Sequence, residues 1–315
     1  MNKKSVIDIS YNSCLVNYRF YNKPGRYITK IFFNDWKNEI NISNIIINIP
    51  RYHLYFDTIL PQTLTNINKN TPEWHYINII KNTYKNNLPK WEIYPSFLVK
   101  KNGINLKYLL INNKLDWLNT KYIFKILLRL LEITNILHNN KIAHLDINPK
   151  NITYDNSIKK FEDRFRLINF SSSDIYPFNY YRETGPSGTI PYCPILSINN
   201  YDHIPNKFPK DWTIINKKLY HRSENKKSYY NIYKHDVYSI GITMYFIFNL
   251  IYHKKYNNLS DAYKIIKNNP TNNEELDIIL LNDILTKMTD RDILKRPTIE
   301  EILLMIKPKN KCIIL

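Results

Sequence analysis

The chain has 315 residues, of which 43% are hydrophobic and 14% aromatic, so it can bury a large core. Its 45 basic and 27 acidic residues give a formal charge of +18. That charge predicts either a solvated, Lys-rich surface or affinity for an anionic membrane surface, nucleic acid or acidic substrates. Nucleic acid is the weakest of these, because the aromatic residues do not alternate with basic ones as they do in nucleic-acid modules.

The three cysteines, Cys14, Cys193 and Cys312, are too few and too far apart for a disulfide scaffold or a zinc site. They fit a reducing compartment, so an intracellular, cytoplasmic protein is expected. No apolar segment follows the first five residues, and no signal peptide is expected. The longest apolar run, residues 240–252, is too short to span a bilayer and predicts a buried helix.

The first third of the chain predicts strands and one helix. Strands are expected at residues 6–9, 15–21 and 26–33, with a turn at 22–25. Alternation in the third strand places Ile28, Lys30 and Phe32 on one face.

A helix capped by Asn34 or Asp35 should then run to about Asn48 and stop at Pro50. Its apolar stripe is Ile42, Ile45, Ile46 and Ile49, and Glu39 is the acidic residue well inside it.

Further elements are predicted up to the middle of the chain. Residues 52–60 read as a strand, 61–95 as a polar, Asn-rich insertion with an ordered part at 74–80, 96–99 as a strand, and 106–111 as a short helix. From Asn119 to Asn139 the apolar spacing is helical. This long helix leads into the stretch His144-Leu145-Asp146-Ile147-Asn148-Pro149-Lys150-Asn151, and a short strand follows at 152–154.

The second half of the chain carries four further patterns. A strand at 165–168 leads into Asn169-Phe170-Ser171, and Gly188-Thr189-Ile190-Pro191-Tyr192-Cys193-Pro194-Ile195 follows. After a basic insertion at about 199–234, a helix is expected to begin at His235-Asp236-Val237-Tyr238-Ser239-Ile240-Gly241. Residues 290–298, ending Lys295-Arg296-Pro297-Thr298, predict a turn before a last helix, in which Ile302, Leu303 and Ile306 face inward.

Together and in this order, these motifs resemble the eukaryotic-type protein kinase superfamily, in a divergent Ser/Thr form. The resemblance covers roughly residues 4–306 and implies an α+β, bilobal fold with a small β-rich lobe and a larger helical lobe. The implied domains are an N-lobe at 1–99 with the insertion at 61–95, a C-lobe at 100–306 with the insertion at about 199–234, and a basic tail at 307–315.

The resemblance also implies roles for single residues. Asp146 would accept the proton of the substrate hydroxyl, and Lys30, paired with Glu39, would contact the phosphates of ATP. Asn151 and Asn169 would hold Mg²⁺ or Mn²⁺.

Three further residues would support this site from outside it. His144 would bond to backbone near the loop, and Asp236 would bond to the loop's backbone. Arg296 would lack its usual partner, because Ile195 replaces the family's glutamate.

The sequence departs from the family in the parts that handle phosphate. Asn169 replaces a metal-binding carboxylate, and an amide oxygen lacks the negative charge that a hard divalent ion favours. No Gly-rich loop is visible, since Tyr11-Asn12-Ser13-Cys14 occupies the first hairpin. Ile28 stands where an alanine usually faces adenine, Asn148 replaces a phosphate-contacting lysine, and Leu145 replaces the arginine that reads phosphorylation of the activation segment.

Two functions from different classes therefore remain open. The first is a protein kinase that transfers phosphate from ATP to Ser/Thr with a metal ion. The second is a pseudokinase that acts as a scaffold or decoy binding partner. A protein substrate or protein partner is expected in either case, and the chain is expected to be a monomer without a specific nucleic acid.

The stretch Lys307-Pro308-Lys309-Asn310-Lys311-Cys312-Ile313-Ile314-Leu315 resembles a geranylgeranyl-type prenylation signal with lysines just upstream. A prenylated Cys312 together with these lysines would associate the protein with an anionic membrane surface. The alternative is a chance match in an Ile-rich chain.

Overall fold

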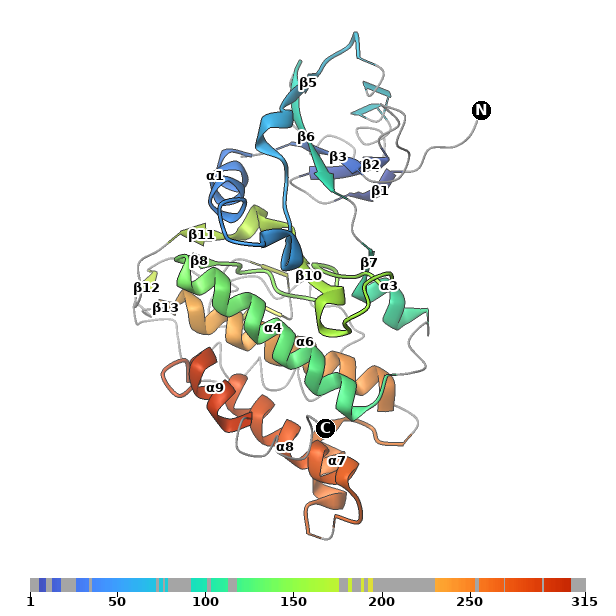
Figure 1. Cartoon of the computed structure of the whole chain (residues 1–315), viewed down its shortest axis with the longest axis vertical. Helices are drawn as coiled ribbons and strands as arrows, with labels where there is room; N and C mark the ends of the chain where they lie inside the picture. Colours follow the sequence, from blue (N-terminus) through green and yellow to red (C-terminus); the bar gives the residue numbers. More distant parts are fainter. Residues whose placement is uncertain are drawn as a thin grey trace, which may run out of the picture. The chain divides into compact units, whose positions relative to one another are not determined.

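The structure is a computed structural model of the chain (Figure 1). It describes residues 6–9, 13–17, 27–33, 36–71, 74–75, 77–78, 92–100, 103–112, 118–175, 181–182, 188–189, 192–194, 230–252, 255–268, 270–290 and 292–306. The architecture is α+β, and the chain divides into two compact units. Unit 1 is Met1–Gly103 with Ile168–Ser173, and unit 2 is Ile104–Leu167 with Asp174–Leu315.

Unit 1 contains an antiparallel sheet with the strand order β1-β2-β3-β6-β5. Its strands are β1 (Val6–Ile9), β2 (Ser13–Asn17), β3 (Tyr27–Phe32), β5 (Thr65–Ile67) and β6 (Tyr94–Lys100). The three predicted N-terminal strands are present, although β2 begins and ends earlier than predicted. Lys30 lies opposite Leu15 on one neighbouring strand and Phe97 on the other, so it occupies the middle of the sheet.

Helix α1 (Lys37–Ile46) of unit 1 begins later than predicted. Its N-cap is Trp36, which makes no capping hydrogen bond through its side chain. The predicted caps, Asn34 and Asp35, lie outside the described residues. The predicted apolar stripe is largely right, because Ile42, Ile46 and Ile49 are buried and Ile45 is half-buried.

One prediction for the next segment is wrong. Residues 52–60 are not one strand: a 3₁₀ turn, η1 (Tyr52–Leu54), follows Arg51, whose φ of 57° is left-handed, and the strand β4 covers Phe56–Asp57, with a single β-bridge from Ile59 to Val99. The predicted insertion at 61–95 begins with the 3₁₀ turn η2 (Pro61–Thr63) and with β5, a strand of the sheet that the sequence did not predict. Because Thr65 and Asn66 are exposed and only Ile67 is buried, this edge strand has a polar sequence.

The segment Ile168–Ser173 belongs to unit 1 although it is far from the rest of that unit in sequence. Within it, the 3₁₀ turn η4 (Phe170–Ser172) places the Phe170 ring 5.9 Å from the Phe56 ring. The Nδ2 of Asn38 on α1 donates a hydrogen bond of 2.7 Å to the carbonyl oxygen of Ser173. These contacts hold the segment beside α1, which fixes the position of Asn169.

Unit 2 is mainly helical. Among its described residues, the helices are α3 (Leu106–Ile111), α4 (Thr120–Asn139), α6 (Ile232–Tyr252), α7 (Leu259–Ile266), α8 (Asn273–Met288) and α9 (Ile299–Ile306). Helix α6 packs against α4 and α8, and Figure 1 shows α4 and α6 side by side. The prediction of α3 matches both ends, and Asn119 caps α4 by accepting a hydrogen bond from the backbone N–H of Tyr122.

Helix α6 contains the apolar run 240–252 and begins at Ile232, three residues before the predicted start. The predicted basic insertion therefore ends earlier than expected, since Tyr230–Asn231 already forms strand β13. In α9, Ile302 and Ile306 are buried as predicted, whereas Leu303 is half-buried. Within the described ranges, no helix combines the length and apolar character needed to cross a membrane.

Short strands position the central loop of unit 2. They are β7 (Ile104–Asn105), β8 (Ile142–Ala143), β9 (Ile152–Tyr154), β10 (Phe165–Ile168), β11 (Asp174–Ile175) and β12 (Tyr181–Arg182), with the 3₁₀ turn η3 (Glu162–Arg164) before β10. β9 pairs with both β7 and β10, β8 pairs with β11, and β12 pairs with β13. The loop 144–151 is thus held at both ends, by β8 and by β9.

Candidate functional site

The loop 144–151 is anchored to helix α6 through a buried carboxylate. Asp236 accepts hydrogen bonds of 2.8 Å from the backbone N–H groups of His144 and of Leu145. Leu145 has a φ of 60°, a left-handed conformation that costs free energy in a residue with a Cβ. The two hydrogen bonds to a charged acceptor offset that cost.

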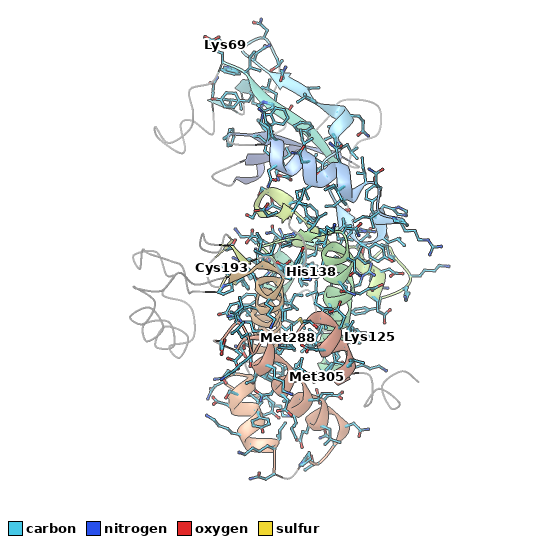
Figure 2. The ribbon with its side chains drawn as sticks, turned by 90° about the vertical axis from the view of Figure 1, so that its left-hand side faces the viewer. Lys69, Lys125, His138, Cys193, Met288 and Met305 are labelled. Carbon is cyan, nitrogen blue, oxygen red and sulfur yellow. The ribbon has the colours of Figure 1, made fainter. Side chains whose placement is uncertain are left out.

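Asp236 has a third partner that the sequence did not reveal. The Nε2 of His138, in the last turn of α4 (Figure 2), lies 2.9 Å from Oδ2 of Asp236. Burial alone would raise the pKa of Asp236, but the hydrogen bond from His138 and the charges of nearby histidines outweigh it and lower that pKa. His138 lies seven residues after Leu131 on the buried side of α4, which is the only sequence signal that pointed to it.

His144 lies at the start of the loop. Its side chain is fully buried, and its Nδ1 lies 3.3 Å from the backbone nitrogen of Asp146. The ring therefore supports the turn of the loop that carries Asp146.

Asp146 is held by three neutral donors. Its Oδ1 accepts hydrogen bonds from the backbone N–H of Thr189, at 2.7 Å, and from Nδ2 of Asn148, at 3.0 Å. Its Oδ2 accepts one from Nδ2 of Asn151, at 2.7 Å. Together these donors fix the plane of the carboxylate. Because all three are neutral, they do not cancel the negative charge of Asp146.

Asn148 has a role that the sequence interpretation missed. In addition to its bond to Oδ1, its Nδ2 lies 3.0 Å from the backbone oxygen of Asp146. Its Oδ1 accepts a hydrogen bond of 2.9 Å from the backbone N–H of Lys150. The residue that replaces the family's lysine thus braces Asp146, which only the folded loop reveals.

The Gly188-Thr189 pair reaches Asp146 because position 188 has no side chain. Gly188 has a φ of +118°, and a Cβ there would lie 2.3 Å from the carbonyl oxygen of Leu145. Only glycine allows this approach, which brings the backbone N–H of Thr189 onto the carboxylate.

In unit 1, a buried ion pair joins β3 to α1. Nζ of Lys30 lies 2.7 Å from Oε1 and 2.8 Å from Oε2 of Glu39, and the two side chains are 5% and 3% exposed. The Phe32 ring, on the same face of β3, has its centroid 5.1 Å from Nζ.

Asn169 completes the group around Lys30. Its Oδ1 lies 3.0 Å from Nζ of Lys30 and accepts a hydrogen bond of 3.1 Å from the hydroxyl of Ser171. Its φ of 66° is left-handed, a conformation that asparagine tolerates better than most residues. We call Lys30, Glu39, Asn169 and Ser171 the Lys30 set, and Asp146, Asn148, Asn151 and Thr189 the Asp146 set.

Arg296 and Cys193 occupy buried positions in unit 2. Nε of Arg296 donates a hydrogen bond of 2.7 Å to the carbonyl oxygen of Asp290, and its guanidinium lies 4.7 Å from the Tyr238 ring. Burial raises the pKa of the Cys193 thiol to about 12, so this thiol stays protonated at neutral pH. Four predicted site residues, Tyr11, Asn12, Ile195 and Cys312, lie outside the described residues, whereas Ser13 and Cys14 begin β2.

The donor set does not fit the divalent ion that the family implies. Mg²⁺ favours anionic oxygen ligands. Both oxygens of Glu39 accept from Lys30, and Asn169 offers a neutral oxygen that already accepts from the same ammonium group. Among the residues that the structure describes, no group of three or more His, Cys, Asp or Glu is placed to hold a metal ion. The neutral oxygen of Asn169, already bonded to Lys30, disfavours its predicted metal role, and the metal role of Asn151 stays a prediction.

Comparison with known proteins gives the family. No protein-family model matches the chain. The chain is 30% identical over 238 residues, 71% of each sequence, to "Putative serine/threonine-protein kinase R436" of Acanthamoeba polyphaga mimivirus. An identity of this level over more than two thirds of both sequences shows common ancestry, and the chain belongs to the protein kinase superfamily. Members of this superfamily in general use ATP and a divalent metal ion.

Proposed function

We propose that the protein is a divergent protein kinase that transfers phosphate from ATP to serine or threonine hydroxyl groups of a protein. In this proposal it has the bilobal kinase fold, with unit 1 as the N-lobe and unit 2 as the C-lobe. The observation that carries the proposal is the Asp146 carboxylate, which three neutral donors orient without cancelling its charge. A protein that only binds partners has no need of such a group.

In the transfer step, Asp146 is the general base. An ionised carboxylate has about four acceptor positions, and the three donors leave room for a substrate hydroxyl. The substrate hydroxyl passes its proton to Asp146 while the hydroxyl oxygen forms a bond to the γ-phosphorus of ATP. The bond between that phosphorus and the oxygen bridging to the β-phosphate breaks, and ADP leaves with the electron pair.

Lys30 supplies positive charge for the phosphates, and Glu39 fixes its position. A buried ammonium held by two carboxylate oxygens has little freedom to move, and such preorganisation is what electrostatic catalysis requires. Asn169 cannot add a negative charge for a metal ion.

A pseudokinase is the second candidate, and Asn169 is the observation that favours it. An amide in place of the metal-binding carboxylate removes a charge that phosphoryl transfer in this family uses. In this alternative the protein still has the kinase fold but acts as a scaffold or decoy for a protein partner.

A transfer assay separates the two candidates. Labelled ATP and a generic protein acceptor are incubated with the full chain in Mg²⁺, in Mn²⁺ and in EDTA. We expect transfer that Asp146→Ala lowers by about 10²- to 10⁴-fold, the usual contribution of a general base. The matched control is Asp283→Ala, an exposed carboxylate on α8. Equal transfer by Asp146→Ala would refute the assigned base, and no transfer by the unmodified protein would favour the pseudokinase.

A further inference from the structure

The Lys30 set has an unusual balance of charge for a site that should meet a polyphosphate. One cation, Lys30, faces one anion, Glu39, and the remaining members, Asn169 and Ser171, are neutral. An aspartate at position 169 would add a negative charge within hydrogen-bond distance of Nζ. That charge would repel phosphate, and in such a site a divalent ion relieves the repulsion by bridging the carboxylate and the phosphates.

Hydrogen bonding defines how the Asn169 amide is oriented. A lysine ammonium group can only donate, so the atom of Asn169 that faces Nζ is the oxygen, and the hydroxyl of Ser171 donates to the same oxygen. Nδ2 therefore points away from Lys30. Unlike a carboxylate, an amide can also donate, so Asn169 can turn its Nδ2 toward an anion once a phosphate oxygen takes its place on Lys30.

The contacts of Lys30 show which of them a phosphate would replace. Its three N–H groups match three acceptor atoms, two on Glu39 and one on Asn169. The bonds to Glu39 join opposite charges and are stronger than the bond to the neutral amide. An incoming phosphate oxygen would therefore displace the Asn169 oxygen and leave the ion pair intact.

We propose that Asn169 is a phosphate-binding residue, whose amide N–H donates to a nucleotide phosphate beside Lys30, so that the protein binds ATP without a divalent cation. This inference rests on the proposed nucleotide binding, but it does not require phosphoryl transfer. The phosphate that lies beside Lys30 needs no bridging metal ion, because Glu39, the carboxylate of the Lys30 set, is already paired with Lys30.

The test measures ATP binding to the full chain by calorimetry and by the shift in melting temperature, in EDTA and in Mg²⁺. We expect the dissociation constants in the two conditions to agree within about threefold, since no metal ion contributes to the contact. Asn169→Asp should bind ATP in EDTA at least about tenfold more weakly and regain affinity in Mg²⁺. Asn44→Asp, at an exposed position of α1, adds the same charge to unit 1 and controls for it.

A second variant keeps the inference testable should Asn169→Asp fail to fold. Asn169→Ala lacks the donor and should weaken ATP binding by about tenfold in both EDTA and Mg²⁺. Binding by the unmodified protein that disappears in EDTA and returns with Mg²⁺ would overturn the inference, as would no ATP binding in either condition. Metal-independent binding without any transfer would support this inference and contradict the proposed kinase activity, so the two can fail separately.

Discussion

The two groups of candidate site residues are built in opposite ways. In the Lys30 set of unit 1, three acceptor atoms surround one cation, and two of them belong to the carboxylate of Glu39. In the Asp146 set of unit 2, three donors surround one anion, and all three are neutral amides. The charge of Lys30 is therefore largely cancelled within its own unit, whereas the charge of Asp146 is oriented but not cancelled.

The difference explains how the two sets tolerate departures from the family. Asn148 replaces a lysine in the Asp146 set, and its amide forms new hydrogen bonds that hold the base. Asn169 replaces a carboxylate in the Lys30 set, and its amide keeps a bond to Lys30 but changes the charge of the set. A substitution among neutral donors preserves the chemistry, while a substitution that removes a charge alters what the set can bind.

The largest expected effect comes from breaking the ion pair of Lys30 and Glu39 in unit 1. Glu39→Gln leaves the Lys30 ammonium buried with neutral acceptors only, and breaking a buried ion pair in this way costs about 3–5 kcal/mol. Urea unfolding of the full chain should show this loss of unfolding free energy. The double variant Lys30→Met with Glu39→Leu buries neither charge and should be closer to the unmodified protein. A loss below about 1 kcal/mol for Glu39→Gln would show that the pair is not buried in solution.

The next effect tests the support beneath the Asp146 set. The Asp236 carboxylate accepts hydrogen bonds from the His138 ring and from the backbone N–H groups of His144 and Leu145. Asp236→Asn replaces one of the two acceptor oxygens by a donor and removes the negative charge of the carboxylate. We expect a loss of about 3 kcal/mol in unfolding free energy, measured in urea. Asp283→Asn makes the same chemical change at an exposed position and should have little effect. Equal stability of both variants would mean that the loop is held by other contacts.

A smaller effect concerns the pH dependence of unit 2. Burial, together with the positive charge of Arg296 and the neighbouring His144, lowers the pKa of His235 from 6.5 to about 3, against an opposing contribution from Asp236. Between these two pKa values the unfolded chain binds a proton that the folded chain excludes, so stability is lost as pH falls from about 6.5 toward 3. From pH 7 to pH 5 the loss from this histidine should be about 2 kcal/mol.

The variant His235→Phe removes that titration. Urea unfolding at pH 7 and pH 5 should give a smaller difference in unfolding free energy for the variant than for the unmodified protein. The same difference in both proteins would show that His235 is protonated in the folded state at pH 5.

The smallest expected effect comes from removing one of the neutral donors that orient the Asp146 carboxylate. Asn148→Ala removes one donor from Oδ1 of Asp146 but leaves the donors Thr189 and Asn151. We expect phosphoryl transfer to fall by about tenfold, the equivalent of one hydrogen bond of about 1.4 kcal/mol. ATP binding, measured by the melting-temperature shift, should not change. Asn148→Asp keeps the shape but sets a second carboxylate against Asp146, and it should lose more activity than Asn148→Ala.

Much of the framework was predictable because it depends on local patterns. Helical spacing predicted α4, and the motif around Asp146 predicted a loop between α4 and β9. The polar edge strand β5 was missed, because two of its three residues face solvent and it gains its structure from pairing with β6. The early start of α6 was missed for a similar reason. Ile232 and Tyr233 pack into a core with Leu145, a residue that is distant from them in sequence.

The sequence by itself determined which family the chain resembles and which residue types stand at positions 30, 39, 146, 151 and 236. It also revealed that position 169 has lost a charge, because charge is a property of the residue alone. Only the tertiary structure decided what surrounds these residues: that His138 bonds to Asp236, that Asn148 braces Asp146, and that Asn169 bonds to Lys30. Hydrogen bonds extend only about 3 Å, so these partners became visible once folding had brought distant parts of the chain together.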